Sequence, residues 1–505
     1  MSEVAYHRTI QRRLSLEVAD FALRFSSVRQ WLLKRGDRAL YEFYCVKRFE
    51  GLPLPVQELR HRVIVNLLHS IERAFADGRV GPSVRKRVLE VLVGQMVANA
   101  RKNVAPFIEL HGFEPPAFLL VSPTQRCNLC CKGCYAASSA TTPATLSYAT
   151  VRRILQDKRD DWGSHFTVIS GGEPLLYKSE GKTLYDLFRE FQDNYFLMFT
   201  NGTLIDERVA ERLAELGNVT AAISVEGFEK ETDRRRGVAV FRKTEHAMHV
   251  LRKAGVPFGI SLTATKENAD ALMQERVIEH YFDDLGAIYA WIFHYMPIGR
   301  SVDTELMVTP DQRKRMLERQ LELLNNRGLF FIDFWNGGPL SGGCVSGGRP
   351  GGYFYIDWNG DIQPCVFVPY AVDNINDVYN SGRTLSSVLD NPVFAGWKSW
   401  QTEYRGRDGQ QAPRNLFAPC PIRDHYDVAH NLLTKHKAKP TNQDAADAIQ
   451  SQEYRNRMLE YGRELSQLLD PMWEMAMHET SAPLDPKHSA PGNSSRPAAR
   501  KNAAE

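Results

Sequence analysis

FLLVSPTQRCNLCCKGC, residues 118–134, joins a short apolar run to a cysteine-rich loop. The run Phe118–Val121 is typical of a buried strand. The loop that follows holds Cys127, Cys131 and Cys134 in a C-x3-C-x2-C spacing. The sequence therefore predicts three thiols gathered on one side of a short loop, at the end of a strand.

Three thiolates on one loop are suited to three corners of a 4Fe-4S cluster, because thiolate is the usual ligand of such clusters. The fourth iron is then open to the amino and carboxylate groups of a methionine, as reductive cleavage of S-adenosylmethionine (SAM) requires. A structural zinc site and inert thiols are the alternatives. Zinc prefers four closed ligands, and only Cys130 is available as the fourth. Cys130 also permits the spacing Cys127-x2-Cys130-x3-Cys134, and we assign it as a bystander.

The C-x3-C-x2-C loop resembles the signature of the radical SAM superfamily. That pattern often has an aromatic residue just before the third cysteine, whereas this chain has Gly133 there and Tyr135 after it. The resemblance implies that Cys127, Cys131 and Cys134 bind a SAM-cleaving 4Fe-4S cluster. It leaves open how the adenine is packed.

The composition of the 505 residues is that of an ordinary globular protein, with 43% hydrophobic and 24% charged residues and a net charge of +3. This charge gives no reason to expect a nucleic-acid partner. Cysteines in metal-like spacings indicate a reducing compartment. The N-terminus lacks an apolar signal region and no stretch approaches the length of a membrane span. We therefore expect a cytoplasmic protein.

Residues 1–115 are predicted to form a helical domain, with helices over 56–76 and 82–103. A further apolar stripe steps at helical spacing near the N-terminus and comprises Leu14, Val18, Phe21, Phe25, Val28 and Leu32. Basic residues nearby make a membrane-surface or partner-docking helix the alternative. Packing on its own domain is the favoured interpretation. Nothing here indicates a module that binds a leader peptide.

Residues 116–330 alternate short β runs with amphipathic helices, which predicts a parallel sheet. The last of these helices is expected to begin with Thr309 as its cap and Pro310 at its first position, and to end at Gly328. Six such units predict an α/β fold, a partial (β/α)6 TIM-like barrel. The predicted strands are Phe118–Val121, Phe166–Ser170, Phe196–Thr200, Val219–Val225, Phe258–Thr263 and Ile288–Tyr295.

Polar motifs follow these strands, at the end where such barrels place their chemistry. Gly171, Gly172, Glu173 and Pro174 follow the second strand and resemble the superfamily's GGEP motif, whose backbone and carboxylate hold the amino group of SAM. Asn201 follows the third strand in a turn similar to the TNG turn of many members. A plain strand-to-helix turn is the alternative.

The remaining predicted SAM contacts come from later strands. Ser224 and Arg236 resemble an S-x-D-G segment and the arginine after it; Glu226 replaces the aspartate, and Arg234 and Arg235 compete for the arginine's place. Ser261 and Thr263 alternate with apolar residues and are predicted to face the lumen. The turn 295–300 is similar to a P-x-G-R turn near the adenine. His165 and His294 are interpreted as structural.

A second set of cysteines lies in residues 331–430. Cys344 stands in a glycine-rich segment, Cys365 ends a predicted hairpin with an Asn-Gly turn, and Cys420 follows later. Together they resemble the SPASM or twitch extension of radical SAM enzymes, a small α+β cap that carries auxiliary iron-sulfur clusters. With three thiols, one cluster is the most that can form. Its fourth position is either open or taken by Asp424 or His425, and the alternative is a structural cap whose thiols bind nothing.

Beyond the cap, residues 431–478 are predicted to be helical, with Tyr454, Met458, Tyr461 and Leu465 facing the core. Residues 479–505 are polar and proline-containing without aromatics, which predicts disorder.

The sequence thus predicts a radical SAM enzyme that abstracts hydrogen from a small-molecule, lipid or peptide substrate. A reductant such as flavodoxin or ferredoxin and no nucleic acid are the expected partners. Two alternatives remain: a non-catalytic iron-sulfur carrier or electron-transfer protein, and a membrane-docked lipid-modifying radical SAM enzyme. The motifs identify neither the substrate nor a catalytic side chain.

Overall fold

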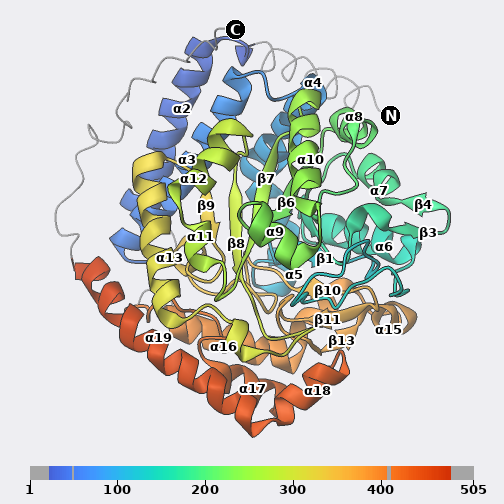
Figure 1. Ribbon diagram of the computed structural model, residues 1–505, viewed down its shortest axis with the longest axis vertical. Coiled ribbons are helices and arrows are strands. Elements are labelled where there is room, and N and C mark those ends of the chain that lie inside the picture. Colours follow the sequence, from blue (N-terminus) through green and yellow to red (C-terminus); the bar gives the residue numbers. More distant parts are fainter. Residues whose placement is uncertain (1–21, 48–50, 407–410, 479–505) are drawn as a thin grey trace.

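A ten-stranded sheet lies at the centre of the protein, with helices packed around it (Figure 1). The computed structural model describes residues 22–47, 51–406 and 411–478. The strand order is β13-β11-β10-β1-β2-β5-β6-β7-β8-β9. Six neighbours in this order are parallel and follow the chain, which confirms the partial (β/α)6 barrel; they are β1 Leu119–Val121, β2 Phe166–Ile169, β5 Tyr195–Thr200, β6 Val219–Val225, β7 Phe258–Ala264 and β8 Ala290–His294.

Helices connect these strands where the sequence predicts them. The helix after β8 shows the clearest local signals: Thr309 caps α13 (Pro310–Glu322) with a capping box to Gln312, and the continuation Leu323–Arg327 ends at Gly328 in the left-handed region. The other crossover helices are α6 Tyr148–Asp160, α7 Leu184–Glu190, α8 Glu207–Leu216, α9 Glu229–Arg236, α10 Val240–Ala254, α11 Ala269–Leu272 and α12 Glu275–Ile278.

The sheet continues past residue 330 at both of its edges. β9 (Phe331–Asp333) pairs in parallel with β8. At the other edge β10 (Tyr355–Ile356) pairs in parallel with β1, and β11 (Asp361–Gln363) returns antiparallel to β10. The predicted hairpin therefore forms, and it also extends the barrel sheet. β13 (Asp373–Asn374) is the last strand on that side.

The N-terminal segment is helical, as expected. Its described elements include α2 Ser26–Tyr41, α3 Leu54–Ala76, α4 Pro82–Arg87, a π-helix over Val88–Ala98 and α5 Ala100–His111. Two helix-ending glycines of the barrel dock this segment: a Cβ on Gly217 would lie 2.6 Å from the Ser83 carbonyl oxygen, and Gly81 N donates to the Gly255 carbonyl oxygen at 2.8 Å.

The apolar stripe near the N-terminus lies only partly within the described residues, because Leu14, Val18 and Phe21 fall outside them. α2 rests on α3, where Arg29 Nε lies 3.1 Å from Glu72 Oε1. None of the residues of α2 is buried, and Leu32 is 43% exposed. Over the part of the chain that the structure describes, no helix is both long enough and apolar enough to cross a membrane.

The C-terminal helices lie across the bottom of the view in Figure 1, and α19 packs against α13. Tyr454, Met458, Tyr461 and Leu465 of α19 are buried, as predicted from their spacing. Residues 479–505, which we expect to be disordered, lie outside the described residues. The elements of this half are α14 Gly338–Ser341, α15 Ile375–Asn380, α16 Pro392–Arg405, α17 Tyr426–Lys435, α18 Gln443–Gln450 and α19 Gln452–His478.

Candidate active site

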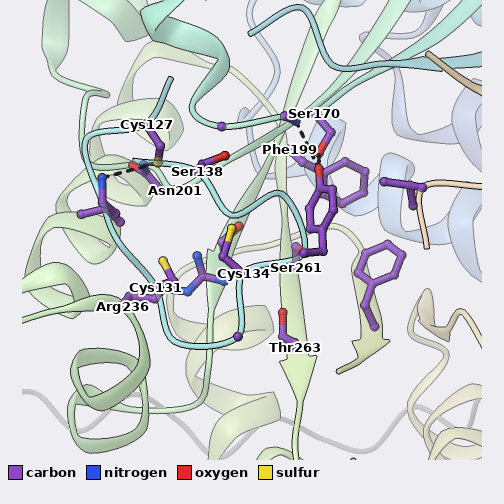
Figure 2. Close-up of a pocket in the computed structure, with 18 of the residues that line it drawn as sticks. Cys127, Cys131, Cys134, Ser138, Ser170, Phe199, Asn201, Arg236, Ser261 and Thr263 are labelled. Atoms are coloured by element: carbon purple, nitrogen blue, oxygen red, sulfur yellow. Dashed lines mark hydrogen bonds between the residues drawn. The ribbon is translucent and has the colours of Figure 1, made fainter. Parts of the chain in front are cut away.

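A cavity of about 160 Å³ lies at the carboxyl ends of the parallel strands (Figure 2). Because these ends meet at one edge of the sheet, motifs far apart in the sequence line the same space. Ten of the predicted site residues line it: Cys127, Cys131, Cys134, Gly171, Gly172, Asn201, Ser224, Arg236, Ser261 and Thr263. Glu173 and Pro174 do not.

The cysteine loop forms one side of this cavity. Burial raises the pKa of the Cys127 thiol to about 12, and its sulfur accepts hydrogen bonds from Leu129 N and Asn201 Nδ2. Burial also raises the pKa of Cys131, while Arg236 and Arg235 act in the opposite direction. Cys130 is exposed and does not line the cavity. The three lining thiols form a donor set suited to an iron-sulfur cluster, and the facing guanidinium groups offset the negative charge of the thiolates.

The glycines of the GGEP segment pack against the residues just before Cys127. Gly172 N donates to the Thr124 carbonyl oxygen at 2.9 Å, and Glu173 N donates to that of Arg126 at 2.8 Å. A Cβ on Gly172 would lie 2.2 Å from the Arg126 carbonyl oxygen. Because Gly172 has no side chain, this loop can pack directly against the cysteine loop and also line the cavity.

Replacing Gly172 by alanine should loosen the cysteine loop, because the Arg126 backbone has to move away from the new methyl group. We expect a cost of about 1–3 kcal/mol and less iron bound per chain after anaerobic reconstitution, measured by iron analysis and visible absorbance. Gly36→Ala is the matched control, since its Cβ would meet only Leu68 Cδ1, at 3.8 Å. Equal iron binding by wild type and Gly172→Ala would contradict this role.

Glu173 is fully buried and holds the neighbouring turn. Its carboxylate accepts hydrogen bonds from Thr200 Oγ1 and Asn201 N, each at 2.8 Å, and from Leu175 N at 3.2 Å. Burial raises its pKa, and these bonds oppose that shift. In the structure Glu173 positions Asn201, which lines the cavity. Contact of the Glu173 carboxylate with the ammonium group of SAM stays a prediction. Pro174 begins a short 3-10 helix behind this loop.

The arginines after β6 converge on the buried Glu226. Its Oε1 accepts from Arg235 Nη1 at 2.6 Å and from Arg236 Nε at 2.8 Å, and its Oε2 accepts from Thr263 N at 3.1 Å. Arg235 and Arg236 both line the cavity, whereas Arg234 pairs with Glu267 near the surface. The sequence left the choice among the three arginines open, and the structure brings both Arg235 and Arg236 to the cavity.

The ring of Tyr295 explains the glycine before the third cysteine. A Cβ on Gly133 would lie 2.7 Å from that ring, so a larger residue at 133 has no room. The turn after Tyr295 also packs on the cysteine loop, where Arg300 N donates to the Cys134 carbonyl oxygen at 3.0 Å. Tyr135, on the other side, bonds Ser170 Oγ through its hydroxyl at 2.8 Å.

Aromatic side chains form the wall opposite the cysteines. Phe199 of β5 and Phe293 of β8 have ring centroids 5.5 Å apart, and Phe293 lies 6.0 Å from Phe367. Figure 2 shows Phe199 across the cavity from Cys127 and Arg236. Val366 and Phe367 directly follow Cys365, so the cap contributes part of this wall. No periodic pattern in the sequence predicts that Val366 and Phe367 line the cavity.

His294 also lines the cavity, which the sequence did not predict. Its Nε2 lies 2.7 Å from Asp333 Oδ2, and both side chains are buried. Burial lowers the pKa of His294 to about 4, so it is neutral at neutral pH. His165 lies elsewhere, and its Nδ1 hydrogen-bonds the Asp193 carbonyl oxygen.

The second set of cysteines comes together within the cap. Burial raises the pKa of Cys420 well above its ordinary value, and the nearby Asp424, Cys344 and Cys365 raise it further. Cys365 is 6% exposed, and burial raises its pKa to about 12. The three thiols lie close enough to interact electrostatically. Their shared ligation of a cluster stays a prediction.

Of the two candidate fourth ligands, Asp424 is already engaged. Its two oxygens bond Arg313 Nη1 at 2.5 Å and Nη2 at 3.0 Å, and Oδ2 also accepts from Cys420 N. The Nε2 of His425 bonds the Ala418 carbonyl oxygen at 2.9 Å. Among the described side chains, no three His, Cys, Asp or Glu residues form a group that could hold a single metal ion.

Comparison with known proteins identifies the core of this chain. A model of the radical SAM superfamily matches residues 121–274, which span the cysteine loop, the GGEP segment and both cavity arginines. The chain belongs to the radical SAM superfamily. Its cofactors are accordingly a 4Fe-4S cluster and SAM, and it is an enzyme. The alternative of a non-catalytic iron-sulfur carrier is thereby set aside.

Two named enzymes are similar in sequence to this radical SAM enzyme. An AdoMet-dependent heme synthase of Methanosarcina barkeri is 26% identical over 290 residues, covering 52% of this chain and 80% of the relative. The mycofactocin maturase MftC of Mycobacterium ulcerans is 28% identical over 331 residues, covering 63% and 82%. Among solved structures, Streptococcus suis SuiB bound to S-adenosylmethionine matches with a TM-score of 0.48 and 19% identity over 60% of this chain and 72% of SuiB.

Proposed function

We propose that this enzyme cleaves SAM reductively and uses the resulting 5'-deoxyadenosyl radical to abstract hydrogen from a peptide or small-molecule substrate. The observation that carries the proposal is the convergence of Cys127, Cys131 and Cys134 with the glycine loop, Asn201 and Arg236 on one cavity. A cluster held by the three cysteines would supply the electron for reductive cleavage of the carbon-sulfur bond of SAM.

The chain's own residues bind and orient SAM beside these cysteines. Arg235 and Arg236 are cations in the cavity wall, and Arg236 is suited to the carboxylate of SAM because guanidinium pairs well with carboxylate. Glu226 holds both guanidinium groups in place, and Glu173 holds the turn that presents Asn201. Ser224, Ser261 and Thr263 offer hydroxyl groups to the ribose or the carboxylate.

The aromatic wall excludes water from the side where the substrate hydrogen is taken. Phe199, Phe293 and Phe367 present no polar group to the cavity, so they favour an apolar part of the substrate next to the radical. Two names among the relatives, heme synthase and maturase, support a tetrapyrrole-like small molecule or a peptide as the substrate class. The electron for SAM cleavage comes from a cellular reductant such as flavodoxin or ferredoxin.

The second cysteine set extends this function. Cys344, Cys365 and Cys420 would hold an auxiliary iron-sulfur cluster, while both carboxylate oxygens of Asp424 accept hydrogen bonds from Arg313. When bound there, such a cluster supplies a one-electron acceptor for the substrate radical. Because Val366 and Phe367 continue directly from Cys365 into the cavity wall, only a short stretch of chain separates the two sites. The net reaction is then an oxidation.

SAM cleavage tests the core of this proposal. Wild-type protein, reconstituted anaerobically with iron and sulfide and reduced with dithionite, should convert SAM to equal amounts of 5'-deoxyadenosine and methionine, quantified by liquid chromatography. S-adenosylhomocysteine, which lacks the sulfonium centre, is the matched control and should give neither product. An assembled cluster that leaves SAM intact under dithionite would contradict the proposal.

A further inference from the structure

Two buried hydroxyl groups point at two of the three cap cysteines. The Tyr353 hydroxyl oxygen lies 3.0 Å from Cys365 Sγ, and the Ser346 Oγ lies 3.0 Å from Cys344 Sγ. Both residues are 2% exposed. A buried hydroxyl needs a partner, and the Tyr353 hydroxyl has the Cys365 sulfur within hydrogen-bond distance.

A neighbouring tryptophan determines the direction of the Ser346 hydrogen bond. Trp397 Nε1 donates to Ser346 Oγ at 2.9 Å, and indole N–H can only donate. The Ser346 hydrogen is therefore available for Cys344. Gln401 Nε2 donates to the carbonyl oxygens of Cys344 and Ser346, each at 2.9 Å, which keeps this loop in register.

The Tyr353 ring is equally well held. It stacks on Phe118 with ring centroids 5.1 Å apart and planes 8° apart. Tyr353 N donates to the Val345 carbonyl oxygen at 2.8 Å, which ties the tyrosine to the loop that carries Cys344. Both hydroxyl donors are thus preorganised by partners other than the sulfurs they face.

We propose that Tyr353 and Ser346 raise the reduction potential of the auxiliary cluster by donating hydrogen bonds to the thiolates of Cys365 and Cys344. Hydrogen bonds to cluster sulfurs stabilise the more negative, reduced state. The site is therefore built to take up an electron, and the enzyme's substrates are those that end in a two-electron oxidised product. This inference rests on the auxiliary cluster of the proposed function.

The test measures the reduction potential and needs no turnover. The full-length variant Cys127→Ala/Cys131→Ala/Cys134→Ala removes the ligands of the SAM-cleaving cluster, so that the remaining iron reports on the cap. In this background, Tyr353→Phe and Ser346→Ala are each titrated anaerobically with a reductant and followed by electron paramagnetic resonance. Tyr370→Phe is the matched control, because its buried hydroxyl donates to the Ala445 carbonyl oxygen instead.

We expect each hydroxyl deletion to shift the reduction equilibrium of the cluster about tenfold toward the oxidised state. For one electron this lowers the reduction potential by about 59 mV. The Tyr370→Phe control should leave the potential unchanged. Trp397→Phe should shift it in the same direction by less. Unchanged reduction potentials would overturn the inference. Loss of iron from both Tyr353→Phe and Ser346→Ala would also overturn it, because the hydroxyl groups would then act in cluster assembly. If the triple-cysteine variant binds no iron, the auxiliary cluster does not form and the inference fails. The SAM-cleavage test would be unaffected.

Discussion

Replacing Cys131 by alanine should abolish 5'-deoxyadenosine formation, down to the level of protein-free buffer. Cys131 lines the cavity beside Arg235 and Arg236, and two thiolates in place of three leave the cluster without a ligand to one of its coordinated irons. The measurement is 5'-deoxyadenosine per chain from SAM and dithionite. Iron analysis on the same samples should show a loss of about four irons per chain.

Cys130→Ala is the matched control for Cys131→Ala, because the two cysteines are adjacent in the chain and only Cys131 faces the cavity. We expect wild-type product and wild-type iron from it. The reverse result, with activity lost in Cys130→Ala and retained in Cys131→Ala, would show that the loop uses the spacing Cys127-x2-Cys130-x3-Cys134 instead.

Replacing Arg313 by methionine should destabilise the protein by about 3–5 kcal/mol, because it leaves Asp424 charged and buried without its partner. Both side chains are at most 1% exposed, and the pair joins α13 to the loop after Cys420. Arg313 also donates to Asn336 Oδ1 and to the Phe417 carbonyl oxygen. The measurement is the urea midpoint of the reconstituted protein, followed by tryptophan fluorescence.

Arg315→Met controls for the loss of a positive charge on the same helix. Arg315 pairs with Asp270 at the surface and is 55% exposed, so we expect little change in the midpoint.

The pH dependence of the Arg313–Asp424 pair provides a second check. Burial alone would raise the pKa of Asp424, but Arg313 together with its other neighbours, Arg423 among them, outweighs burial and the pKa is lowered. The pair therefore stabilises the fold above the ordinary aspartate pKa and less as the pH falls through the lowered one. Equal midpoints for Arg313→Met and wild type at neutral pH would refute this role.

Local patterns were sufficient to predict the barrel and the position of its chemistry. The strands β1, β2, β5, β6, β7 and β8 and the helix from Thr309 to Gly328 lie where the sequence predicts them, because caps, glycines and apolar runs act on residues a few positions apart. The cysteine spacing and the two glycines after β2 likewise gave cavity residues from short stretches of chain.

Contacts between distant segments were decided by the tertiary structure. Long side chains choose among several partners within reach: Glu173 bonds the Asn201 turn, Glu226 holds both Arg235 and Arg236, and Asp424 is taken by Arg313. A sequence shows that such groups exist, and only packing shows which pairs are buried together.

The same holds for the edges of the sheet and the cavity wall. The backbone groups of a strand pair with whichever edge is presented to them, so the hairpin after Tyr353 joins β1, more than two hundred residues earlier, and brings Val366 and Phe367 to the cavity. By itself, then, the sequence determined the superfamily chemistry and the order of its elements, since these depend on local spacing. The tertiary structure alone decided how the two cysteine sites are joined and oriented, since that depends on burial and on hydrogen bonds between remote parts of the chain.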